Sequence, residues 1–151
     1  MMQYAPCPLC QPADTRHEIW RNAQLRVIDV PDAGFPGYTR VIWNGHVTEM
    51  TDLDAPQRQH LMDAVWLVET VMRNELAPLK VNLAQFGNQV PHLHWHVIPR
   101  WPLDPHFPDA AWAAPVPRSP EQTLAWQGFH EQQENLLPAY HAALRAALET
   151  L

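Results

Sequence analysis

Three histidines alternate with apolar residues in the stretch "HLHWHVIPR", which occupies residues 92–100. Successive side chains of a β-strand point to opposite faces, so the pattern predicts a strand with His92, His94 and His96 on one face. Same-face neighbours on a strand lie about 6.6–7 Å apart, so the three imidazoles can serve one shared site. The opposite face is predicted to be core and consists of Leu93, Trp95 and Val97.

Three interpretations fit a strand face that carries three histidines. The imidazoles could ligate a metal, because neutral imidazole is the commonest zinc donor in proteins. They could instead provide a nucleophile with acid–base helpers, because an imidazole can attack phosphorus and form a covalent intermediate. The third interpretation is a solvated strand face that is rich in histidine. Strict alternation beside a wholly apolar face disfavours this last interpretation.

The composition indicates one globular domain. The chain has 151 residues, of which 46% are hydrophobic and 17% charged, and its net charge is −6. This charge does not predict a basic surface for a nucleic acid polymer. No apolar run approaches the about 20 residues that cross a bilayer, and the start of the sequence does not resemble a secretory signal. With Cys7 and Cys10 as the only cysteines, we expect a cytoplasmic protein without a disulfide framework or a membrane partner.

Hydrophobic patterning predicts an α+β fold. Strands are expected at 25–30, 38–43, 80–86 and 92–100, the first two forming a hairpin. A long helix is expected over 55–76, with Asp54 as its N-cap and an apolar face that packs on the sheet.

The remainder of the chain is divided by its prolines. Residues 99–118 contain six prolines together with aromatic residues, which predicts an irregular loop packed onto the protein. Ser119 and Gln122 form a capping-box pattern that begins a helical extension over 119–151, with a break expected at Pro138.

The histidine stretch resembles the signature of the histidine-triad (HIT) family of nucleotide hydrolases and transferases, in which three histidines alternate with apolar residues. "GNQVP" before it and "RVIWNGHVTEMTDL" at 40–53 are similar to the corresponding family segments. The resemblance covers about residues 7–101, and the chain looks most like the bacterial branch described as diadenosine-tetraphosphate-hydrolase-like. It implies an antiparallel sheet of about five strands with the long helix packed on it. The HIT-like domain is then expected over 1–118, with the extension 119–151 packed on the same domain. Family members are commonly homodimers.

The resemblance also implies an activity. In the family the middle histidine, here His94, attacks the α-phosphorus of a nucleotide and forms a nucleotidyl-histidine that water hydrolyses. His96 would contact phosphate oxygen or help the leaving group depart. We therefore expect a hydrolase of nucleotide phosphoanhydride or phosphoramidate bonds, with dinucleoside polyphosphates favoured as substrates. The alternative is a nucleotide-binding or sensor protein with weak turnover, which Tyr38 favours because many members carry a histidine at that position.

Polar residues near the triad match positions that contact substrate in the family. Asn88 and Gln89 are also typical turn residues. Asp29, with Asp32 as the runner-up, matches the ribose-contacting position, although a turn-forming aspartate explains either one equally well. The expected substrate-binding residues are Asn82, Asn88, Gln89, Asp29 and Tyr38.

The pair Cys7 and Cys10 in "CPLC" is compatible with zinc binding or with redox chemistry. A redox pair would be expected to open a helix after a strand, and no such pattern surrounds it. Some relatives bind zinc through a C-x-x-C pair and two histidines, and the matching positions here are His46 and His92. A set of two cysteines and two histidines is a closed tetrahedral site, so such a zinc would be structural. A metalloenzyme that uses all three triad histidines is the weaker alternative, and no organic cofactor is expected.

Overall fold

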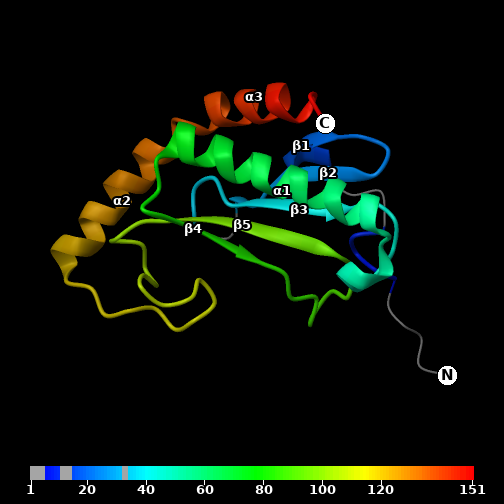
Figure 1. Cartoon of the computed structure of the whole chain (residues 1–151). Coiled ribbons are helices and arrows are strands. Elements are labelled where there is room, and N and C mark those ends of the chain that lie inside the picture. The colour runs from blue at the N-terminus through cyan, green and yellow to red at the C-terminus, as the bar shows by residue number, and fades with distance from the viewer. Residues whose placement is uncertain (1–5, 11–14, 32–33) are drawn as a thin grey trace.

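The computed structural model describes residues 6–10, 15–31 and 34–151 (Figure 1). Within these residues, five strands form one antiparallel sheet in the order β1-β2-β3-β5-β4. The strands are β1 (Glu18–Arg21), β2 (Leu25–Asp29), β3 (Thr39–Trp43), β4 (Lys80–Ala84) and β5 (His94–Arg100). The α-helices are α1 (Ala55–Leu76), α2 (Pro120–Glu134) and α3 (Leu137–Leu148). The α+β class predicted from the sequence is confirmed.

The helices α1 and α3 cover one face of the sheet (Figure 1). Asp54 caps α1 as predicted: its side chain accepts from the Gln57 amide, and Gln57 bonds back to the Asp54 amide. The apolar side chains of the strands point to this helix-covered face, and Val27, Val41 and Val97 are completely buried there. The sheet therefore has one core face and one face that carries the triad.

The extension at the end of the chain packs on the same core face. Ser119 and Gln122 form the predicted capping box, and α2 and α3 are separated just before Pro138, which lies in the first turn of α3. Arg145 of α3 donates to the Ile19 carbonyl at 3.1 Å, which ties the extension to β1. In the part of the chain that the structure describes, no helix has the length and apolarity to cross a bilayer.

Each of the four predicted strands is shorter than predicted by one or two residues at one end, and one strand was not predicted. His92 precedes β5 because its amide bonds to the Val90 carbonyl in a turn, at 2.8 Å. At the other end β5 continues through Pro99 to Arg100, so the irregular loop begins later than expected. Pro99 is tolerated because the pairing of β5 with β3 ends at Val97, leaving β4 as the neighbour there. The unpredicted strand is β1, whose four residues are too short for a clear alternation.

The loop after β5 is irregular, as predicted, but is strongly anchored. Asp104 is completely buried and accepts from Arg100 Nε at 2.9 Å and Nη2 at 3.1 Å. The Asp104 carboxylate also accepts backbone amides, including that of Phe107 at 2.7 Å. Arg118 Nη2 closes the loop by donating to the carbonyls of Asp104 at 3.0 Å and Phe107 at 2.6 Å. These bonds hold the loop beside the open face of the sheet.

Candidate active site

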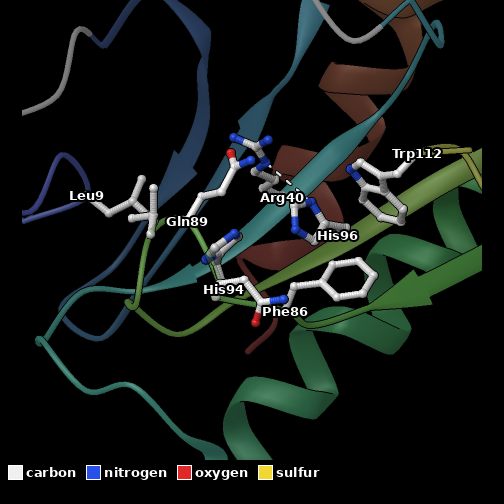
Figure 2. Close-up of a pocket in the computed structure, with 10 residues that line it drawn as sticks. Leu9, Arg40, Phe86, Gln89, His94, His96 and Trp112 are labelled. Atoms are coloured by element: carbon white, nitrogen blue, oxygen red, sulfur yellow. Dashed lines mark hydrogen bonds between the residues drawn. The ribbon is translucent and has the colours of Figure 1, made fainter.

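The triad histidines of β5 lie in a cavity of about 370 Å³ on the open face of the sheet (Figure 2). In the sheet register His94 is opposite Ile42 of β3, and His96 lies between Arg40 of β3 and Ala84 of β4. The connection from β4 to β5 and the loop after β5 complete the cavity. Its lining outside β3 and β5 consists of Leu9, Phe86, Gly87, Asn88, Gln89, Val90 and Trp112.

Hydrogen-bond partners fix the neutral tautomers of His92 and His94. His94 Nδ1 lies 2.6 Å from the His92 carbonyl, which can only accept, so Nδ1 carries the hydrogen and Nε2 has a free lone pair. His92 Nε2 lies 2.6 Å from the Trp43 carbonyl, so in His92 the free lone pair is on Nδ1. His94 therefore has a nucleophilic Nε2, whereas His92 presents Nδ1 as a ligand atom.

His96 has the opposite tautomer to His94. Its Nδ1 lies 3.4 Å from Arg40 Nε, an obligate donor, and 2.6 Å from the Tyr38 hydroxyl. Nδ1 must therefore accept, and in the neutral ring Nε2 carries the hydrogen. The imidazole rings of His94 and His96 are 4.8 Å apart between centroids. One ring offers a lone pair and its neighbour offers an N–H, which are the two functions that attack on phosphorus and stabilisation of a departing oxygen require.

Burial keeps these imidazoles neutral. It lowers the pKa of His94, an effect that the hydrogen bond to the His92 carbonyl partly opposes. Burial, with smaller contributions from the charges of His94 and Arg40, lowers the pKa of His96 to about 3. Burial also raises the pKa of Tyr38, which stays a neutral hydroxyl. The neutral forms that the tautomer assignment requires are therefore the ones that the surroundings favour.

Two of the expected substrate-binding residues lie in the cavity with the histidines, and three do not. Asn88 and Gln89 are exposed and line it. Tyr38 is buried behind His96, and the Asn82 side chain accepts from Arg100 Nη1 at 2.9 Å. Asp29 lines a second cavity of about 210 Å³, and its Oδ1 lies 3.8 Å from His141 Nε2 on α3. The runner-up for the ribose contact, residue 32, lies outside the described residues.

Arg40 is a site residue that the sequence reasoning missed. It lines both cavities, and Figure 2 shows it beside His96 and Gln89. Among the described residues no carboxylate pairs with its guanidinium, which also lies 5.8 Å from the Tyr38 ring centroid. An arginine without a counterion, next to the triad, is suited to bind a phosphate. The signal in the sequence was a single cation in the otherwise apolar alternation of "YTRVIW".

The four expected metal ligands converge at the edge of the cavity. One ligand atom from each of Cys7, Cys10, His46 and His92 lies within 4.8 Å of the other three. His92 Nδ1 lies 3.2 Å from His46 Nδ1, 3.4 Å from Cys10 Sγ and 3.5 Å from Cys7 Sγ. A tetrahedral zinc with its usual bond lengths separates such ligand atoms by about 3.3–3.8 Å. The donor set and its spacing fit a metal ion, and the Trp43 carbonyl fixes the His92 ring in the ligating tautomer.

Between the two cysteines, Leu9 connects the four candidate metal ligands with the cavity that contains His94 and His96. Its side chain lines both cavities, and its carbonyl accepts from Arg26 Nη2. Arg26 is almost completely buried on the open face of β2 and also donates to Asn44 at 3.3 Å. The cysteine loop is therefore fixed to the sheet where the two cavities meet.

Comparison with known proteins agrees with this fold. The model of the HIT domain family matches residues 15–103. The chain belongs to the HIT family. Membership in this family supports a nucleotide-related function. Cys7 and Cys10 lie outside the segment that the family model matches.

Solved HIT structures share the fold. A histidine triad protein from Bradyrhizobium japonicum is 24% identical, with a TM-score of 0.60, over 77% of this chain and 88% of that one. One from Marinobacter aquaeolei is 25% identical, with a TM-score of 0.60, over 79% and 88%. A hypothetical histidine triad nucleotide-binding protein from Sulfolobus tokodaii is 21% identical, with a TM-score of 0.51, over 80% and 85%. No curated protein matches the chain in sequence.

Proposed function

We propose that this HIT protein hydrolyses nucleotide phosphoanhydrides through a covalent nucleotidyl intermediate on His94. The observation that carries the proposal is the pair of opposite tautomers: His94 presents a free Nε2 lone pair, and His96 presents an Nε2–H beside it. Arg40, Asn88 and Gln89 supply donors around the same cavity for the phosphate oxygens.

The first step forms the bond between His94 Nε2 and the α-phosphorus and breaks the bond from that phosphorus to the bridging oxygen. The electron pair stays on this oxygen, which leaves as a phosphate anion that accepts a hydrogen bond from His96 Nε2–H. Water then attacks the phosphorus, the P–N bond breaks, and the electron pair returns to His94. The water proton that is lost passes to the departed phosphate or to solvent. The His92 carbonyl holds the His94 Nδ1–H throughout.

The neutral state of the His96 imidazole favours cleavage of a phosphoanhydride over cleavage of a phosphoramidate. A neutral imidazole whose Nδ1 already accepts two donors is a hydrogen-bond donor at Nε2 rather than a strong acid. A phosphate leaving group departs as a stable anion, whereas the amine of a phosphoramidate must gain a proton. This difference supports a phosphoanhydride, with dinucleoside polyphosphates such as diadenosine tetraphosphate as the substrates. We place the retained nucleoside in the second cavity, which Asp29 lines.

The alternative remains a nucleotide-binding or sensor protein with little turnover. Tyr38 no longer favours this alternative, because its hydroxyl bonds to His96 and orients that ring. Binding alone needs neither a nucleophile in its reactive tautomer nor a donor beside it.

Trapping the intermediate tests the proposal. The protein is mixed with α-³²P-labelled diadenosine tetraphosphate, quenched in alkali and examined for an acid-labile nucleotidyl-protein. We expect label on the parent protein and none on His94→Ala. Label that persists in this variant, or hydrolysis by it at the parent's rate, would overturn the assignment. His130→Ala, on α2 away from the cavity, is the control and should be labelled like the parent.

We further propose that Cys7, Cys10, His46 and His92 hold a structural zinc ion. The fit of the donor set and the ligating tautomer of His92 support this assignment. A bound zinc would fix the cysteine loop against the sheet. The closed set of four protein ligands leaves catalysis to His94 and His96.

We also propose a homodimer, as the family resemblance implies. The exposed Trp66 on α1 and Leu79 just before β4 are apolar positions that a second copy could cover. Light scattering of the parent and of Leu79→Asp tests this: we expect a dimer and a shift toward monomer, respectively. A monomeric parent would contradict the proposal.

A further inference from the structure

We propose that Phe86 and Trp112 form a stacking subsite for a planar base carried by the leaving group. The inference rests on the proposed function and assigns the second nucleoside of a dinucleoside polyphosphate to these two residues. Neither aromatic residue belongs to the triad motif, and Trp112 lies beyond the segment that the family model matches.

The two rings are unusually exposed for their size and lie in the catalytic cavity. Phe86 and Trp112 are each 52% exposed, and both line the cavity with His94 and His96. Their ring centroids are 4.7 Å apart and their planes meet at 84°. Figure 2 shows both rings next to His96. An exposed aromatic pair at the mouth of a polar cavity offers the surface on which a nucleobase stacks.

The position of the pair assigns it to the leaving group. The centroids of Phe86 and Trp112 lie 6.1 Å and 5.3 Å from that of His96. His94 makes its ring contact, within the described part of the chain, with His96. His96 is the group that meets the departing oxygen, so the aromatic pair borders the path of the leaving group. The second cavity, beyond Arg40, is left for the nucleoside that stays on His94.

Both rings are held in place before any ligand binds. The carbonyl of Ala113, next to Trp112, accepts from His106 Nδ1 at 2.7 Å. The carbonyl of Asp109, three residues before Trp112, accepts from Nη2 of the buried Arg100 at 2.8 Å. Phe86 is the second residue after β4 and precedes Gly87, whose φ of +77° turns the chain. A preformed surface loses little conformational freedom when a base stacks on it.

The size of the expected effect follows from measured base stacking. Removing an aromatic partner of one base weakens binding by about 5- to 150-fold. This loss should affect only substrates whose leaving group carries a base. The ratio of kcat/KM for a substrate with the second nucleoside to that for one without it, compared between parent and variant, therefore measures the subsite.

The experiment compares diadenosine tetraphosphate with adenosine 5′-tetraphosphate, which has the same adenylyl end and lacks the second nucleoside. For the parent we expect kcat/KM to be at least fivefold higher with the dinucleotide. In Trp112→Ala and Phe86→Ala the ratio should fall toward one, while Trp112→Phe should keep most of it. Leu124→Ala is the control, since Leu124 is an apolar side chain that is 69% exposed on α2 and does not line the cavity. It should keep the parent's ratio.

The outcomes separate the subsite from the catalytic proposal. An unchanged ratio in a folded Trp112→Ala protein would overturn the subsite while the hydrolase assignment stood. If neither substrate reacts, the proposed function fails, and binding of ATP against tripolyphosphate then tests the subsite alone. In that case the subsite is supported if the parent binds ATP more tightly than tripolyphosphate and Trp112→Ala binds the two equally. Equal binding of the two by the parent would refute the subsite. A change of oligomeric state in Trp112→Ala, with the ratio kept, would assign the aromatic pair to a second copy of the chain instead.

Discussion

The Tyr38 hydroxyl lies 2.6 Å from His96 Nδ1, and the two rings meet edge to face with centroids 5.8 Å apart. Tyr38 has a neutral hydroxyl and does not act as an acid or base here. It lies behind the triad, buried with Phe35 and Ile98, and acts on His96 rather than on substrate. Together with Arg40 it keeps Nδ1 an acceptor and so directs the N–H of His96 into the cavity.

Replacing Tyr38 with phenylalanine should therefore reduce kcat with little effect on KM. The variant loses a hydrogen bond that orients His96, and an effect of about 10- to 100-fold is expected, corresponding to about 1.4–2.7 kcal/mol. Nitrogen-15 NMR of the imidazole should show a less uniform Nε2–H tautomer. Tyr140→Phe is the matched control, because its buried hydroxyl bonds to Thr39 at 2.8 Å, away from the cavity. If both variants lose equal activity, Tyr38 has only a structural role.

Arg40 should contribute more to the rate than any neutral donor in the cavity. Arg40→Leu removes the guanidinium that lines the cavity with His94 and His96, and losing such a charge-stabilising donor costs about 10²–10³ in kcat. Arg40→Lys should recover part of the loss, since it keeps the charge but not the fork of donors. Steady-state kinetics with diadenosine tetraphosphate measure the effect, with the exposed Arg73→Gln on α1 as the control. A leucine variant within threefold of the parent would remove Arg40 from the site.

The pH profile should reflect the buried imidazoles. Burial lowers the pKa of His94, so its Nε2 stays unprotonated, and kcat/KM should hold constant as the pH falls through 6.5. Stability should behave differently, because the pKa of His96 is about 3 in the folded chain and about 6.5 when unfolded. Below pH 6.5 the unfolded state binds a proton that the folded state does not, so stability falls from there toward pH 3. Urea unfolding should show a shallower decline for His96→Asn, and an identical decline would contradict the assignment.

The buried pair of Arg100 and Asp104 should control both stability and the aromatic loop. Asp104→Asn leaves the Arg100 charge without its partner, and breaking such a pair costs about 3–5 kcal/mol of unfolding free energy. Burial alone would raise the pKa of Asp104, but the bonds from Arg100 and the His106 amide outweigh it and hold the pKa below its usual range. The pair therefore stabilises the fold above about pH 4 and is lost as the pH falls through the lowered pKa.

Urea denaturation of Asp104→Asn against Asp109→Asn measures this contribution. Asp109 is an exposed carboxylate of the same loop, and its variant should unfold like the parent. The Asp104 variant should also lose the preference for a second nucleoside, because the loop that holds Trp112 loosens. If the two variants have the same free energy of unfolding, the pair of Arg100 and Asp104 does not anchor the loop.

Removing one cysteine should abolish metal binding. We expect one zinc ion per chain in the parent and less than a tenth of that in the Cys7→Ser variant, as measured by inductively coupled plasma mass spectrometry. Chelation should lower the melting temperature of the parent and leave that of Cys7→Ser unchanged, since metal binding contributes folding free energy. His60→Ala, which removes a histidine outside the cluster, should retain the metal. Full zinc content in the serine variant would contradict the four-ligand site.

The sequence was informative where a local pattern determines the structure. The alternation at 92–100 predicted the shared face of His94 and His96, whereas His92 lies in the turn before β5 and not in the cavity. The caps at Asp54 and Ser119 predicted the starts of α1 and α2. β1 was missed because four residues carry little periodicity. The alternation also predicted that the strand reaches Arg100, but the prolines placed the start of the irregular loop two residues too early, because Pro99 pairs only with β4.

The site was predictable to the extent that motifs describe it. His94 and His96 follow from the alternation, and the four metal ligands follow from the family resemblance. Arg40 became a site residue only through the long-range register that places it opposite His96. Trp112 depends on the path of a loop without regular structure, which buried hydrogen bonds to Asp104 determine.

Leu9 gives the metal cluster a consequence for ligand binding. It lies between two metal ligands in the chain and lines both cavities at the same time. Any ion that orders the cysteine loop also orders this wall of the site. Metal binding and nucleotide binding are then linked. The factor by which a metal ion strengthens nucleotide binding equals the factor by which nucleotide strengthens metal binding. A change in substrate concentration would in this way change how firmly the four candidate ligands hold a metal ion.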